Sequence, residues 1–145
     1  MQDHYSKLER MYAGAPLHAK FPDIKLSIKK NFAKITLPID KSYHHAGGYM
    51  HGAIYFKLLD DVCYFAAMSE EFEHFYVTSS FNIRYQRPYK EGLVIAESID
   101  VKWFEDEFHV SAVLHSEEGK KLAEGDGVFK KSRYKLDASI GYRLD

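Results

Sequence analysis

The chain has 145 residues, of which 46% are hydrophobic and 28% charged, and its formal net charge is −1. This composition is typical of one globular domain with its own core, and it provides no overall positive field that would attract nucleic acid. No apolar run approaches the ~18 residues of a membrane span, and the N-terminal MQDHYSKLER has no hydrophobic signal core. The single cysteine, Cys63, excludes an internal disulfide framework. We therefore expect a cytoplasmic protein in a reducing compartment.

The first third of the chain predicts one short helix and one hairpin. In residues 3–13, apolar side chains recur at helical spacing, and a Gly-Ala-Pro stretch ends the pattern. Residues 24–39 alternate between apolar and polar on both sides of Lys30–Asn31, which predicts two antiparallel strands joined by a short turn. We expect residues 40–50 to form a loop.

The most apolar segment, residues 52–69, predicts a long helix. It contains no proline and no internal glycine, and it is too long for a typical strand. Its apolar residues extend nearly all the way round, so the helix must be buried on most sides. The charged residues within it are Lys57, Asp60 and Asp61. Because a buried carboxylate is costly unless it is paired or used in chemistry, the two aspartates require an explanation.

Four strand-like runs follow the helix. They are separated by short polar turns of hairpin length, and a polar tail starts at about residue 132. In the first run, strict alternation predicts Phe81 on one face and Thr78 on the other. The order of the elements predicts a single α+β domain over residues 1–145, in which one antiparallel sheet wraps around the long central helix. The predicted runs are 75–86, 92–104, 107–116 and 121–131.

The start of the long helix is suited to binding an anion or a carbonyl group. The first N–H groups of a helix lack intrahelical acceptors, and the helix dipole is positive there. In MHGA at 50–53, we expect His51 to be the N-cap and Gly52 to be the first helical residue. Glycine lets a ligand approach the backbone closely. His51 is then either a plain helix cap or a support for a bound carbonyl group.

HHAGGYMHGAIYFKLLDD at 44–61 resembles the motif of hotdog-fold acyl-CoA thioesterases related to the phenylacetate-pathway and 4-hydroxybenzoyl-CoA enzymes. In that family an Asn is followed six residues later by His-Gly-Gly, and nine residues after this His an Asp lies in the central helix. The corresponding residues here are His45, His51-Gly52-Ala53 and Asp60. VTSSFNIRYQRPYKEG at 77–92 is similar to the family's strand that ends in an aromatic residue, a proline and a gapped glycine. The resemblance implies a hotdog fold and an acyl-CoA thioesterase.

The resemblance also implies roles for individual residues. Asp60 corresponds to the nucleophile or general base, and the Gly52 amide to the group that polarises the thioester carbonyl, with His51 in support. Thr78 matches the Ser or Thr that helps to orient the attacking water. The departure is His45, which stands where the family usually has Asn, so the resemblance does not extend to how the water or the leaving thiolate is held. The resemblance implies acyl-CoA as the substrate and no metal or cofactor.

The spacing within the long helix adds a constraint that is independent of the family. Nine residues of helix rise ~13 Å and end half a turn out of phase. Asp60 therefore cannot reach an acyl group held at the N-terminus of its own helix. A two-fold axis that places two such helices antiparallel would bring Asp60 of one chain to Gly52 of the other. We expect a homo-oligomer, a dimer or a dimer of dimers, with shared active sites.

Four polar residues near the end of the first long strand are candidates for binding the coenzyme A part of the substrate. Arg and Lys suit nucleotide phosphates, although a cluster of this kind is equally consistent with a solvated strand end. The candidates are Asn82, Arg84, Arg87 and Lys90.

Several other residues of the motif region have structural interpretations, and two other functions are compatible with the sequence. We expect Asp61 to pair with Lys57 at i, i+4 in a surface-type contact, and Cys63 to be an inert core residue. Two adjacent histidines at 44 and 45, with no obvious third ligand, do not predict a metal site. The alternative functions are a hotdog dehydratase or hydratase, whose acid lies about five residues after the glycine, where this chain has Lys57, and a non-catalytic acyl-CoA-binding protein, which His45 would favour.

Overall fold

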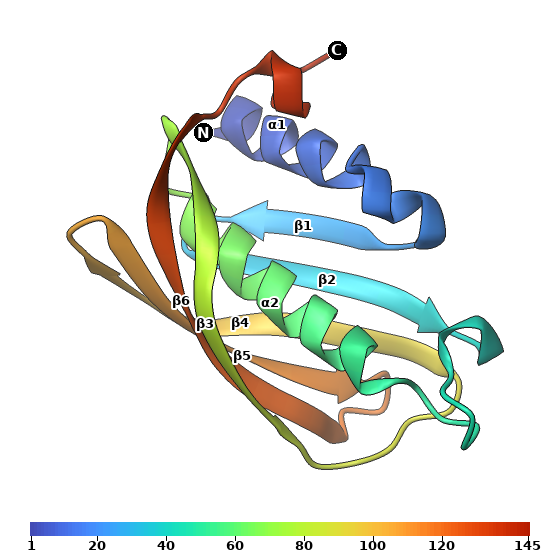
Figure 1. The fold of residues 1–145 in the computed structure, drawn as a ribbon. Coiled ribbons are helices and arrows are strands. Elements are labelled where there is room, and N and C mark those ends of the chain that lie inside the picture. The colour runs from blue at the N-terminus through green and yellow to red at the C-terminus, as the bar shows by residue number, and fades with distance from the viewer.

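The segments of alternating polarity form six strands, which pair into one antiparallel sheet in the order β1-β2-β4-β5-β6-β3 (Figure 1). The computed structural model describes residues 1–145. The outer strands of the sheet are β1 and β3. The predicted antiparallel sheet is thereby confirmed. The strands are β1 (Lys25–Lys29), β2 (Phe32–Ile39), β3 (His74–Tyr85), β4 (Gly92–Phe104), β5 (Glu107–Ser116) and β6 (Lys121–Lys135).

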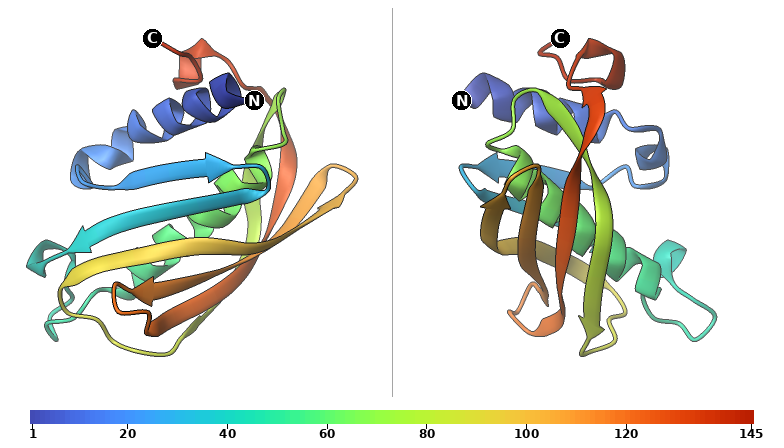
Figure 2. Two further views of the ribbon diagram at one scale, coloured as in Figure 1. Left: turned by 180° about the vertical axis from the view of Figure 1, so that it is seen from behind. Right: turned by 60° about the vertical axis from the view of Figure 1, so that its left-hand side comes forward.

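Two α-helices lie on one side of this sheet. The long helix α2 (Gly52–Met68) runs across the concave face and contacts every strand, whereas α1 (Gln2–Ala13) packs beside β1 (Figures 1 and 2). Both helices begin and end within one residue of their predicted bounds. Neither they nor the short 3-10 turns combine the length and hydrophobicity that a membrane crossing requires. The 3-10 turns are η1 (Pro16–Lys20), η2 (Lys41–Tyr43) and η3 (Ala138–Ile140).

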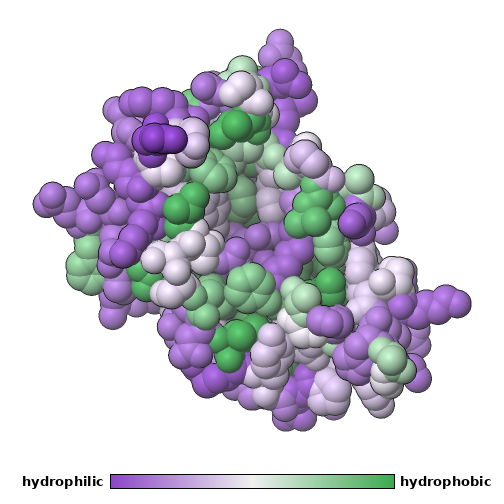
Figure 3. Space-filling model, in the orientation of Figure 1, coloured by the Kyte–Doolittle hydropathy of each residue, from purple (hydrophilic) through white to green (hydrophobic).

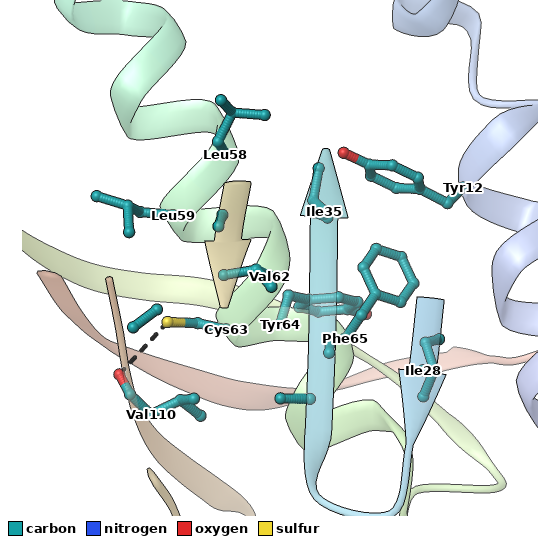
Figure 4. Packing of buried hydrophobic residues seen from close by; sticks show 14 of the residues in the cluster. Tyr12, Ile28, Ile35, Leu58, Leu59, Val62, Cys63, Tyr64, Phe65 and Val110 are labelled. Atoms are coloured by element: carbon teal, nitrogen blue, oxygen red, sulfur yellow. Dashed lines mark hydrogen bonds between the residues drawn. The ribbon is translucent and has the colours of Figure 1, made fainter. Parts of the chain in front are cut away.

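The second half of α2 is buried on all sides, as its composition predicts. Every residue from Val62 to Met68 is buried, and Figure 4 shows the α2 side chains packed against Ile35 of β2 and Val110 of β5. The thiol of Cys63 donates a hydrogen bond to the Val110 carbonyl at 3.6 Å, and burial raises its pKa well above the ordinary value. Cys63 is therefore an unreactive core residue, as expected. Burial of each large apolar side chain of α2 contributes about 1.5–3 kcal/mol to the free energy of unfolding.

The C-terminal tail begins later than predicted. β6 continues to Lys135, and its last residues pair with the start of β3, with Tyr76 opposite Lys131 and His74 opposite Lys135. Polar side chains do not exclude a strand here because the backbone supplies the pairing while the side chains face water. The remaining tail folds back over α1, where the Tyr142 hydroxyl donates to Nδ1 of His4 at 2.6 Å.

A β-bulge changes the faces of β3. The register between β3 and β6 shifts between Thr78 and Ser80, so one extra residue interrupts the alternation. Thr78 and Phe81 consequently both point towards α2, where Thr78 bonds to Asp60 and the Phe81 ring lies 5.4 Å from that of Phe56. The prediction that Thr78 and Phe81 occupy opposite faces is wrong for this reason.

Candidate active site

Asp60 projects from the middle of α2 towards the bulge of β3. Its Oδ1 atom accepts a hydrogen bond of 2.9 Å from the hydroxyl of Thr78. The two residues are 18 positions apart in the sequence, and the bulge is what aims Thr78 at the helix. The structure therefore brings together two of the residues implied by the family resemblance.

Asp60 is an unusual carboxyl group because it is largely removed from water. Burial raises its pKa from the ordinary 3.8 to about 6, and the neighbouring charge of Asp61 adds to this effect. The hydrogen bond from Thr78 and the positive charge of Lys57 act in the opposite direction. A carboxyl group with a pKa near 6 is still ionised at pH 7 and is basic enough to take a proton in catalysis.

Asp61 has a different environment, although it is the next residue. Its Oδ2 atom accepts hydrogen bonds of 2.7 Å from both the ammonium group of Lys57 and the hydroxyl of Tyr12. The predicted Lys57–Asp61 pair is confirmed, but it is not a surface contact: the two side chains are only 12% and 20% exposed. Tyr12 belongs to α1, and the helical spacing of apolar residues in this segment indicates only a core position for it. Nothing in the sequence revealed its hydroxyl as a partner of Asp61.

A cavity of about 1130 Å³ opens beside these carboxylates. Asp60 and Thr78 lie on its wall, together with aromatic side chains of α2 and β3. Figure 3 shows a hollow on this face, with hydrophilic atoms inside it and hydrophobic residues around its rim. The remaining walls come from residues 10–18 and, in the C-terminal segment, from residues 138–141 and Arg143. The cavity is large enough for a small organic group to reach Asp60.

The N-terminus of α2 forms a second polar cluster. His51 is the N-cap, as predicted, and its Nδ1 atom accepts a hydrogen bond of 2.9 Å from the N–H of Ala53. A neutral histidine that accepts at Nδ1 carries its proton on Nε2, which leaves a free donor. The N–H of Gly52 has no acceptor within the chain, and its carbonyl accepts from the Tyr85 hydroxyl at 3.2 Å. Two donors are thus available at the positive end of the helix.

His45 lies close to this cluster. Its Nδ1 atom accepts a hydrogen bond of 2.9 Å from the N–H of Gly47, and its ring centre is 6.4 Å from that of His51. His45 therefore also carries its proton on Nε2 when neutral. The adjacent His44 turns elsewhere and donates to the carbonyl of Lys90 at 2.6 Å. No three histidine, cysteine or acidic side chains are grouped so that they could hold a metal ion.

The four residues proposed for coenzyme A have different surroundings. Arg84 is paired with Glu124 at 3.3 Å and Asp126 at 3.8 Å. Arg87 and Lys90 are exposed and make no salt bridge, and their backbone carbonyls bond to Tyr55 and His44 beside the helix N-terminus. Asn82 is exposed on β3. Only Arg87 and Lys90 are therefore both free and next to the second cluster.

Asp60 and Gly52 belong to one continuous helix, as the spacing argument requires. The helix extends unbroken from Gly52 to Met68, and eight residues of it rise about 12 Å. Asp60, Thr78 and the cavity form the first polar cluster, beside the middle of α2. His45, His51 and the Gly52 amide form the second polar cluster, at the start of the same helix.

Comparison with known proteins identifies the family. A family model described as Thioesterase superfamily matches residues 47–123, more than half of the chain, and the match contains Gly52, Asp60 and Thr78. The chain belongs to the thioesterase superfamily. A search of curated protein sequences finds no significant match.

Solved structures confirm the hotdog fold. The chain is similar to the PaaI protein of the phenylacetic acid degradation operon of E. coli, with 18% identity, a TM-score of 0.81, and coverage of 92% of this chain and 96% of that one. It is also similar to the conserved protein PA5202 from Pseudomonas aeruginosa, with 24% identity, a TM-score of 0.74, and coverage of 81% and 94%. A third neighbour is smu.793 from Streptococcus mutans bound to acetyl CoA, with 18% identity, a TM-score of 0.70, and coverage of 77% and 90%.

Proposed function

We propose that this member of the thioesterase superfamily hydrolyses an acyl-CoA thioester to a free acid and coenzyme A. The observation that carries the proposal is the partly buried carboxylate of Asp60, bonded to Thr78 at 2.9 Å on the wall of a cavity. Its raised pKa gives it the basicity that attack on a thioester requires. Membership of the superfamily and the acetyl CoA bound to the similar protein smu.793 support the choice of substrate.

In this proposal Asp60 drives the attack on the thioester carbonyl. It either removes a proton from a water molecule that Thr78 helps to orient, or attacks the carbonyl carbon itself to give an acyl-enzyme that water then hydrolyses. The carbonyl oxygen takes up negative charge in both routes, and the N–H of Gly52 with Nε2–H of His51 stabilises it. The C–S bond then breaks, and the coenzyme A thiolate leaves and takes up a proton. None of these steps needs a metal or cofactor.

We propose that each site is shared by two chains, because Asp60 and Gly52 lie about 12 Å apart along one helix. Two features support a homo-oligomer. β3 is a twelve-residue outer strand whose free edge is open to pairing, and large hydrophobic side chains are exposed on β3 and on the adjoining turn of α2, namely Val77, Tyr85 and Phe56. A dimer, or a dimer of dimers, would cover this surface and join the two polar clusters.

Coenzyme A is proposed to lie along the loop that follows β3. Arg87 and Lys90 are the first candidates for its phosphates, since both are exposed and without an acidic partner. Arg84 would have to exchange Glu124 and Asp126 for a phosphate group. Asn82 would contribute from the neighbouring part of β3, as a neutral hydrogen-bonding residue.

The experiment is a hydrolysis assay of the Asp60→Asn variant with acetyl-, phenylacetyl- and palmitoyl-CoA. Released thiol can be detected with a disulfide reagent, because the only cysteine of the chain, Cys63, is buried. Loss of the reacting carboxylate is expected to lower kcat at least ~100-fold. Asp61→Asn removes the same charge one residue along and should retain most of the activity at pH 8.

Two results would contradict the proposal. Equal activity of Asp60→Asn and the wild type would remove Asp60 from the chemistry. Binding of acyl-CoA without release of thiol from any member of the panel would favour the non-catalytic alternative.

A further inference from the structure

Lys57 lies at the centre of a partly buried polar network beside Asp60. Its ammonium nitrogen is 2.7 Å from Oδ2 of Asp61 and 2.8 Å from Nε2 of His18. The same nitrogen lies over the rings of Tyr12 and Phe21, 5.3 and 5.1 Å from their centres. A cation held by a carboxylate, an imidazole and two aromatic faces has few other positions available.

Every other member of the network is also held in place. The Tyr12 hydroxyl donates to Oδ2 of Asp61 at 2.7 Å. His18 donates through Nδ1–H to the backbone carbonyl of Tyr12, so its Nε2 atom accepts from Lys57 and the ring is neutral. Burial lowers the pKa of His18, which keeps it neutral near pH 7. The only full charges at the centre of the network are therefore those of Lys57 and Asp61.

This arrangement gives two adjacent carboxylates a single cation. Lys57 forms its salt bridge with Asp61 and lies beyond 4.0 Å of the Asp60 oxygens. Asp60 therefore experiences the positive charge of Lys57 and the negative charge of Asp61 without bonding to either. Its oxygens, apart from the bond to Thr78, stay free on the cavity side.

We propose that Lys57 and Asp61 are positioning residues that set the charge of Asp60: Lys57 favours its ionised form, Asp61 opposes it, and the salt bridge between them keeps Lys57 from neutralising Asp60 directly. The proposal rests on the proposed role of Asp60 in thioester hydrolysis. It also gives the N-terminal segment a part in the site, since Tyr12, His18 and Phe21 precede residue 47, where the family match begins.

The two charges act on Asp60 with opposite signs, which makes the proposal testable. Removal of Lys57 leaves two neighbouring carboxylates without a cation, so Asp60 should hold its proton to higher pH. Removal of Asp61 leaves a cation without its carboxylate, so Asp60 should lose its proton at lower pH. The other titratable or charged groups that face this part of the cavity are Tyr12 and Arg10 of α1, His18 of η1, Tyr64 of α2, Tyr76 of β3 and Arg143 of the tail. They are unchanged in both variants.

The test measures the titration of Asp60 in the full-length protein in two ways. The first is the pH profile of kcat/KM for the best thioester substrate, and the second is carbon-13 NMR of the aspartate carboxyl groups, assigned with Asp60→Asn. Lys57→Met is expected to move the acid limb and the Asp60 titration upward by about one pH unit, and Asp61→Asn to move both downward. Lys57→Arg should restore the wild-type profile. Lys102→Met, which removes an exposed lysine of β4, is the matched control.

Shifts of the same sign in Lys57→Met and Asp61→Asn, or no shift in either, would overturn the inference. The NMR titration separates this failure from failure of the proposed function. Opposite shifts of Asp60 in a protein that hydrolyses no thioester would support the charge network and refute the enzymatic role. Hydrolysis that depends on Asp60 but not on Lys57 would support the enzymatic role and refute the charge network.

Discussion

Asp60→Asn should be more stable than the wild type at pH 8, because the wild-type protein ionises a partly buried carboxyl group. The pKa of Asp60 is about 6 in the folded chain, against an ordinary value of 3.8. Folding therefore holds the proton of Asp60 more tightly than the unfolded chain does. The free energy of unfolding falls as the pH rises from about 4 through 6, and the full penalty applies above that range.

The size of the penalty follows from the two pKa values. Their difference of about two pH units corresponds to about 3 kcal/mol, and the remaining contact of Asp60 with water lowers the expected gain to about 2 kcal/mol. Asparagine carries no charge and can still accept the hydrogen bond from Thr78 through its amide oxygen. The variant should therefore gain stability at pH 8 and differ little from the wild type at pH 4.

The assay is urea unfolding followed by circular dichroism at both pH values, at one protein concentration because the proposed assembly would make stability depend on concentration. Asp61→Asn is the control, since it removes the charge that Lys57 and Tyr12 hold and should lose about 1–3 kcal/mol at pH 8. An Asp60→Asn variant that is no more stable than the wild type at pH 8 would refute the reasoning, because ionisation of Asp60 would then cost nothing.

Two further predictions concern the reaction. Thr78→Val removes the hydroxyl that bonds to Asp60 and holds its pKa down. In this variant kcat at pH 7 should fall about tenfold, and the acid limb of the pH profile should move to higher pH. Thr78→Ser keeps the hydroxyl and should leave both kcat and the acid limb unchanged. Asp60→Asn and Gly52→Pro should each be inactive alone. The proline at position 52 is compatible with the backbone because the preceding residue, His51, is extended, with φ −65° and ψ 142°. If the sites are shared, co-refolding of the two variants should restore about a quarter of wild-type activity. Mixed dimers without activity would place the whole site in one chain.

Local periodicity predicted most of this fold because each element has a strong pattern of its own. Helix α2 follows from an apolar run without proline or internal glycine, and the β1–β2 hairpin from alternation around Lys30–Asn31. Asn31 indeed adopts the positive φ of 53° that the tight turn requires. Patterns of this kind depend only on neighbours in the sequence, so they can be recognised without knowledge of any tertiary contact.

The contacts that long-range packing decides were the ones that sequence reasoning missed. The bulge beside Thr78 appears only in the pairing of β3 with β6, and it reverses the predicted faces of the residues that follow. Likewise, Tyr12 and His18 reach Lys57 and Asp61 across 39 to 49 residues of sequence. Their roles depend on how α1 and η1 pack against α2, which no spacing within either segment specifies.

Helix geometry explains why the two adjacent aspartates of the most apolar helix have different surroundings. Successive residues of an α-helix point about 100° apart. From the same turn of α2, Asp60 therefore faces β3 and the cavity, while Asp61 faces α1. Asp61 meets a hydroxyl and an ammonium group and becomes a satisfied structural charge. Asp60 meets only the hydroxyl of Thr78, and this incomplete pairing in a partly buried place makes it costly to ionise and leaves its oxygens available for the proposed reaction.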